Sequence, residues 1–272
     1  SIDALAAESA AASMVEPRYG WAIGAVMVAA AQHTTDPFLH AVAQLYLARA
    51  ANGYYRPKRV AIAAAQARDG FVALGEAGWT AVCDWQANAI AWMRPNFTQV
   101  VAIVEAALPV IETHHPQFVP DCRLSLAYAY LLVGRIEEMT AQIEMARATF
   151  VATDNQLGLA HCLYAEAAYQ RRFSQFPAAQ ANLERALTLY TAESATVPIT
   201  IVQYNLAYLT REMTGDMTRA MAMFEAAATQ FGALDLPLWQ AQCWNALAVT
   251  YNSTGQPMQA GRLYQQAGEL FT

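Results

Sequence analysis

The chain has 272 residues, enough for one large domain or two small ones with a sizeable core. Apolar residues make up 56% of it and charged residues only 14%, which excludes an intrinsically disordered chain. The formal net charge is -6, and this acidic balance argues against duplex DNA or an anionic membrane as the main partner. The longest apolar run, residues 20–31, is too short to span a bilayer, and no signal peptide opens the sequence. A cytoplasmic location is therefore expected.

In chain order, the sequence predicts a succession of helix pairs. Residues 1–36 are expected to form a degenerate N-terminal helix pair, and residues 37–272 a repeat domain. Prolines mark the expected helix starts, because proline is tolerated in the first helical turn. The expected repeat units span about 38–78, 80–118, 120–159, 160–200, 201–240 and 241–272.

A period of about 40 residues organises this repeat domain. A shift of 40 residues superposes Asn205 on Asn245 and Phe224 on Tyr264. The four cysteines follow the same period, since their separations along the chain are 39, 40 and 81 residues. They have no metal-binding or redox spacing, and equivalent positions in stacked repeats lie too far apart for a disulfide. We therefore expect all four to be free and buried: Cys83, Cys122, Cys162 and Cys243.

The last unit carries a spaced series of aromatic, small and glycine residues: Trp244, Leu247, Ala248, Tyr251, Gly255, Ala260, Tyr264 and Ala267. This series resembles the tetratricopeptide repeat (TPR) family, whose signature is W-x2-L-G-x2-Y followed by A, F and A. The units are longer than the usual ~34 residues, like those of maltose-regulon-type activators and of proteins with a CHAT domain. The resemblance implies an all-α fold, a right-handed α-solenoid (superhelix) of about six TPR-like repeats. A HEAT-type or other helical solenoid and a non-repeating bundle are the alternatives.

The chain lacks the short motifs that mark phosphate binding, zinc proteases or serine hydrolases. His161 and Cys162 are adjacent in the sequence, but neighbours on a helix point about 100° apart and cannot form a catalytic dyad. We therefore expect no enzyme activity, no metal site and no cofactor.

In TPR proteins, one face of the first helix of each pair lines the concave side of the superhelix. The resemblance implies that this face forms a groove for a peptide or partner, aromatic toward the N-terminus and rich in amides toward the C-terminus. The alternative is that Trp85, Trp92 and Tyr128 belong to the core. The expected groove residues are Trp85, Trp92, Tyr128, Leu131, Tyr164, Arg171, Asn205, Leu209, Glu212, Asn245 and Asn252.

Two functions are compatible with this reading. The first is a non-catalytic protein-interaction scaffold that binds a peptide or a partner domain in the groove. The second is a ligand-sensing regulatory segment of a larger protein, whose effector domain is a CHAT caspase-like protease or a DNA-binding regulator. In either case this segment itself is expected to contact no nucleic acid and no membrane. An apolar stripe over residues 263–271 without a covering helix favours a larger protein. An open groove would favour the first function, and a small-molecule pocket with rigid polar groups the second.

Overall fold

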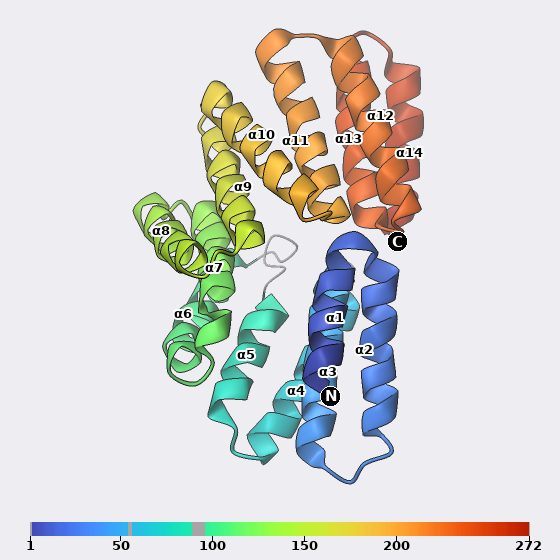
Figure 1. Cartoon of the computed structure of the whole chain (residues 1–272). Helices are drawn as coiled ribbons and strands as arrows, with labels where there is room; N and C mark the ends of the chain where they lie inside the picture. The colour runs from blue at the N-terminus through green and yellow to red at the C-terminus, as the bar shows by residue number, and fades with distance from the viewer. Residues whose placement is uncertain (1, 54–55, 89–95, 272) are drawn as a thin grey trace. The chain divides into compact units, whose positions relative to one another are not determined.

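The computed structural model of the protein describes residues 2–53, 56–88 and 96–271. These residues form the α-helices α1 to α14 and one short 3₁₀ helix, with no strand among them (Figure 1). The all-α class and the helical-repeat architecture expected from the sequence are therefore confirmed. In the described part of the chain, no helix has the length and apolar character needed to cross a membrane.

The chain divides into two compact units, Ser1–Ala165 and Glu166–Thr272, whose boundary falls within α9. Unit 1 contains α1 (Ile2–Val15), α2 (Pro17–Ala31), α3 (Pro37–Gly53), α4 (Pro57–Ala73), α5 (Ala77–Asn88), α6 (Phe97–His114), the 3₁₀ helix Pro116–Phe118, α7 (Val119–Val133), α8 (Ile136–Ala152) and the start of α9 (Gln156–Arg172). Unit 2 contains the rest of α9, α10 (Phe176–Ala192), α11 (Thr196–Thr214), α12 (Met217–Ala233), α13 (Pro237–Ser253) and α14 (Pro257–Phe271).

Successive helices pack against each other within each unit, as α3 does with α4 and α13 with α14 (Figure 1). From α3 onward, the odd-numbered helices are the first members of the helix pairs and are called A helices below. The even-numbered helices from α4 onward are the second members and are called B helices.

The length of the repeat comes from its helices. The helices α9, α10 and α12 have 17 residues each, and α11 begins only a few residues after α10 ends. The connections are short because the backbone reverses at single left-handed residues. Gly134 (φ 81°) and Gly215 (φ 65°) take this conformation at the ends of α7 and α11. Glycine adopts it without a steric penalty, whereas Ser174 (φ 57°) and Ser194 (φ 55°) adopt it at some cost.

The core repeats along the chain together with the sequence. Ala127, Ala167 and Ala248 are almost fully buried, so that neighbouring helices approach closely at these positions. Large aromatic side chains fill the space between one B helix and the next A helix. Phe231 of α12 stacks on Trp239 of α13 with ring centroids 5.5 Å apart.

The four cysteines, Cys83, Cys122, Cys162 and Cys243, are free and fully buried, as their spacing predicted. Burial raises the pKa of Cys83, Cys122 and Cys243 to about 12. Their thiols therefore remain protonated near neutral pH, and they contribute to packing as small apolar side chains.

Candidate functional site

One face of the A helices in unit 1 carries two neighbouring tyrosines. Tyr128 of α7 and Tyr164 of α9 are both half-buried, and their ring centroids lie 6.3 Å apart. The helical period places Asp121 on the same face of α7 as Tyr128, and His161 on the same face of α9 as Tyr164. Tyr128 and Tyr164, both predicted as groove residues, therefore lie next to each other.

Asp121 and His161 line a cavity of about 240 Å³ between α1, α3, α7 and the start of α9. Its polar lining consists of Arg49 from α3, Asp121 from the first turn of α7, Asn155 just before α9 and His161 from α9. Its apolar lining includes Met14 and Leu157. All of these residues belong to unit 1.

Gly158 also lines this cavity, and its small size is a requirement of the fold. It lies directly against the aromatic ring of Phe150, so a Cβ atom at position 158 would overlap that ring. In the C-terminal unit, the equivalent position of α13 holds Trp239. A glycine at this position of α9 therefore leaves one wall of the cavity without a side chain.

The guanidinium of Arg49 is held against aromatic rings. Its central carbon lies 4.6 Å from the ring centroid of Phe118 and 5.8 Å from that of Tyr46. The Nη1 atom of Arg49 is buried and has no hydrogen-bond partner in the described part of the chain. Burial also lowers the pKa of Arg49, although the nearby Asp121 opposes that shift. Arg49 therefore combines a buried N–H group that lacks a partner with a place in the wall of the cavity.

Burial also shifts the pKa values of the two other titratable groups of the cavity, Asp121 and His161. It raises the pKa of Asp121, and the charge of Arg49 acts in the opposite direction. It lowers the pKa of His161 to about 4, so the imidazole is neutral near pH 7. The cavity therefore contains one positive group, one acidic group, the amide of Asn155 and one neutral ring.

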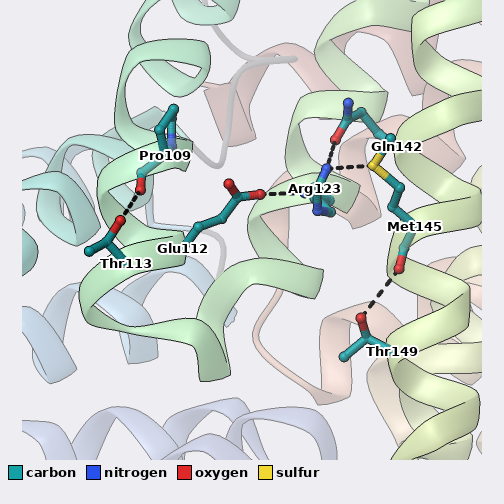
Figure 2. Close-up of polar contacts among 7 residues, drawn as sticks. All are labelled: Pro109, Glu112, Thr113, Arg123, Gln142, Met145 and Thr149. Atoms are coloured by element: carbon teal, nitrogen blue, oxygen red, sulfur yellow. Dashed lines mark hydrogen bonds and ion pairs between the residues drawn. The ribbon is translucent and has the colours of Figure 1, made fainter.

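Arg123 of α7, in contrast, has a structural role, because its guanidinium bonds to neighbouring helices (Figure 2). Its Nη1 donates to Gln142 Oε1 at 2.8 Å and contacts Met145 Sδ, and its Nη2 donates to Glu112. It thereby connects α7 to α6 on one side and to α8 on the other. Arg123 uses its donors within the repeat stack, whereas Arg49 keeps a buried donor without a partner.

The A helices of unit 2 carry a different arrangement, in which two arginines contact the ring of one tyrosine. The guanidinium carbons of Arg171 and Arg211 lie 4.8 Å and 4.5 Å from the ring centroid of Tyr208. Arg211 also donates to Thr250 Oγ1 at 3.3 Å and to Glu212 Oε1 at 2.9 Å. The Nε atom of Arg171 is buried and has no hydrogen-bond partner among the described residues.

The predicted site residues Glu212, Asn245 and Asn252 are exposed on unit 2. Asn245 and Asn252 lie on one face of α13 together with Val249, whose exposed fraction is 46%. This face presents two amides around an exposed apolar side chain. It can donate and accept hydrogen bonds to an extended backbone.

Four predicted groove residues are buried instead, which corrects their assignment to an open face. Trp85 is only 3% exposed, and its Nε1 donates to Ser125 Oγ at 3.0 Å. Asn205 is 8% exposed and donates to the backbone oxygen of Ile201 at 2.9 Å, within its own helix. Leu131 and Leu209 are also buried, with exposed fractions of 6% and 1%. Trp92 lies outside the described residues.

Sequence reasoning missed Arg49, Asp121, Tyr208 and Arg211 as site residues. A signal was present for part of the set, since Arg211 follows Arg171 by one repeat and His161 follows Asp121 by one repeat. Recurrence of charged side chains on A helices marks positions that packing alone does not require. No repeat signal was available for Arg49, because its environment depends on the rings of Tyr46 and Phe118.

Residues that could carry metal or thiol chemistry are not grouped. Among the described residues, no cluster of three or more His, Cys, Asp and Glu side chains could hold a metal ion. Cys162, next to His161, is fully buried.

Comparison with known proteins identifies the fold. No model of a known protein family matches the sequence, and no curated protein matches it. Among solved structures, a Rap protein complexed with competence and sporulation factor covers 92% of this chain and 69% of its own length, with a TM-score of 0.69 and 11% identity. The quorum sensor NprR from B. thuringiensis, in its apo form, covers 94% of this chain and 83% of its own, with a TM-score of 0.56 and 12% identity.

A third similar structure is a signal transduction ATPase with numerous domains (STAND) from Pyrococcus horikoshii, which has a tetratricopeptide repeat sensor. The match covers 94% of this chain but 40% of the ATPase, with a TM-score of 0.55 and 12% identity. The chain therefore has the fold of the TPR-like repeat proteins, as the sequence pattern predicted. At these identities the likeness concerns the fold alone.

Proposed function

We propose that the chain is a non-catalytic binding protein whose A-helix faces hold a peptide or a segment of a partner protein. The observation that carries this proposal is the pair Tyr128 and Tyr164. Both side chains are half-buried, and they adjoin each other on neighbouring A helices. Aromatic residues of this kind dominate the energetics of protein interfaces, because they remove a large area from water at a low cost in conformational entropy.

Unit 2 supports the same proposal with different chemistry. Its exposed amides Asn245 and Asn252 offer donors and acceptors to a bound backbone, and the buried Arg171 Nε offers a further donor. Two structures of the same fold bear names that fit a signal-binding role, the Rap complex with competence and sporulation factor and the quorum sensor NprR.

Selection of heptapeptides from a random phage-displayed library on the full chain tests the proposal. Fluorescence anisotropy then measures the affinity of each selected peptide. Tyr128→Ala should weaken binding by about 2 kcal/mol or more, which is roughly 30-fold. Tyr19→Ala is the matched control, because Tyr19 is an exposed tyrosine of unit 1 on α2 and its loss should leave the affinity unchanged.

A thermal melt of each variant separates binding from stability. If Tyr128 serves the core instead, Tyr128→Ala should lower the melting temperature strongly and leave the peptide affinity as it was. That result, or a library that yields no peptide sensitive to Tyr128→Ala, Tyr164→Ala or Asn245→Ala, would refute the proposal.

The regulatory alternative has one observation in its favour. The structure of the STAND ATPase contains a tetratricopeptide repeat sensor of the same fold within a much longer chain. On this reading, the present segment senses a ligand for an effector domain of the same polypeptide. The full reading frame decides it, because it must then encode such a domain, for example a CHAT protease or a DNA-binding regulator.

A further inference from the structure

Two opposite charges line the cavity of unit 1 without pairing with each other. Arg49 Nη1 has no hydrogen-bond partner, and Asp121 makes no side-chain hydrogen bond or ion pair with any described residue. The charge of each group nevertheless acts on the pKa of the other, since Asp121 raises that of Arg49 and Arg49 lowers that of Asp121. Their charges are therefore close enough to interact through the cavity, yet no bond joins them.

Two arginines close to this cavity in the sequence are paired instead. Arg123 and Arg135, the other arginines near α7, both engage carboxylates: Arg123 donates to Glu112, and Arg135 donates to Glu105 and Glu138 at 2.8 and 2.9 Å. Burial of a charged group without a partner is costly, and stacking on Phe118 offsets only part of that cost. The cavity therefore retains unsatisfied donors and acceptors that a bound molecule can satisfy.

The size and the walls of the cavity restrict what that molecule is. Its volume of about 240 Å³ lies below the ~300–1,000 Å³ typical of sites for drug-sized ligands, so the ligand is small. The polar lining holds one cation, one acid and the uncharged side chains of Asn155 and His161. It complements a molecule of zero net charge that carries both a negative and a positive group. Met14 and Leu157 provide apolar surface for the remainder of the ligand.

We propose that this cavity binds a free α-amino acid with an apolar side chain. The α-carboxylate accepts hydrogen bonds from the guanidinium of Arg49, and the α-ammonium donates to the carboxylate of Asp121. The side chain of the amino acid then packs against Met14 and Leu157. This site does not depend on the polypeptide-binding surface of Tyr128 and Tyr164, so either proposal can fail alone.

The burial effects on the charged groups agree with this assignment. Burial lowers the pKa of Arg49 and raises the pKa of Asp121, which means that the protein surroundings of both groups disfavour their charged forms. A zwitterion supplies each of them with an opposite charge. A simple anion would satisfy Arg49 but would place a second negative charge beside Asp121.

Isothermal titration calorimetry on the full chain with L-leucine, L-isoleucine, L-valine, L-methionine and L-phenylalanine, one at a time, tests the proposal. At least one of them should bind. The N-acetyl derivative of the tightest binder lacks the ammonium, and its amide lacks the carboxylate. Each derivative should bind about tenfold more weakly or worse, because each leaves one buried charge without its partner.

Variants of the two charged residues provide the second readout. Arg49→Gln and Asp121→Asn should each weaken binding of the amino acid by about tenfold or more. Arg135→Gln is the matched control, because this arginine of the same unit lies outside the cavity and should leave the affinity unchanged. Thermal melts of all three variants check folding, and the isosteric Asp121→Asn decides the outcome if Arg49→Gln does not fold.

Three results would overturn the assignment. The first is that none of the five amino acids binds the full chain. The second is that the N-acetyl derivative binds as tightly as the amino acid, which would define a site for anions only. The third is that a folded Asp121→Asn variant binds the amino acid with unchanged affinity.

Discussion

The two units solve the same packing problem in the same way at positions four repeats apart. In unit 1, Phe71 at the end of α4 stacks on Trp79 of α5 with a centroid distance of 5.6 Å and an interplanar angle of 14°. In unit 2, Phe231 and Trp239 repeat this contact between α12 and α13 at 5.5 Å and 19°. The joint between a B helix and the next A helix is thus a recurring element of the fold.

The open faces of the A helices differ between the units. Unit 1 encloses Arg49 and Asp121 in a cavity, whereas unit 2 places Arg171 and Arg211 against the ring of Tyr208. In a solenoid, the residues that pack between neighbouring repeats recur from repeat to repeat, whereas residues outside these contacts can differ. The difference agrees with the proposal that the A-helix faces bind ligands while the joints between pairs stabilise the fold.

Removal of the recurring aromatic contact should have the largest effect, and a similar one in both units. Phe71→Ala and Phe231→Ala should each lower the free energy of unfolding by about 3–5 kcal/mol, because both rings are fully buried and leave a cavity. Urea denaturation measures the loss. Phe173→Ala serves as the control, since the Phe173 side chain is 49% exposed and its removal should cost much less. A loss confined to one unit would break the equivalence of the two joints.

The core was predictable from the sequence because it repeats. Ala127, Ala167 and the four cysteines recur near a fixed spacing, and each proved to be buried. The site was less predictable, because the same repeat position differs in exposure from one repeat to another. Asn205 and Leu209 of α11 are buried, whereas Asn245 and Val249 occupy the equivalent positions of α13 and are exposed. The packing around each helix decides which side chains are accessible, and the sequence period does not specify that packing.

Acid should weaken unit 1 more than unit 2. All five histidines lie in unit 1, and burial lowers the pKa of His161 from 6.5 to about 4. The unfolded chain therefore binds a proton at this residue below about pH 6.5, while the folded chain resists protonation until about pH 4. Stability contributed by the neutral ring is complete above pH 6.5 and declines as the pH falls toward 4.

The variant His161→Gln isolates this effect. Between pH 7 and pH 4.5, wild-type protein should lose about 2–3 kcal/mol more of its free energy of unfolding than the variant does. Urea denaturation at both pH values measures the difference. His33→Gln is the control, because His33 is exposed in the same unit and should leave the pH dependence unaltered. Equal pH slopes for wild type and His161→Gln would show that the ring is not protected from protonation.

The stack in unit 2 should give the smallest effect. Tyr208→Leu removes the ring that Arg171 and Arg211 contact and should cost about 1–2 kcal/mol, the range of partly desolvated cation–π contacts. Tyr208→Phe retains the ring and should cost less than Tyr208→Leu. Thermal or urea denaturation compares the two. If the two variants are equally destabilised, the hydroxyl of Tyr208 matters and the stacked ring does not.

The left-handed conformation of Ser174 and Ser194 makes the fold less stable than it could be with glycine at these positions. A residue with a Cβ atom in that conformation costs about 1–2 kcal/mol relative to glycine, and these two connections accept the cost. Replacement by glycine relieves the strain, although the greater freedom of glycine in the unfolded chain returns part of the gain. Both serines lie in connections between helices, away from either A-helix face. The binding surfaces thus have room to diversify, because a destabilising substitution on them can be offset at a distant turn.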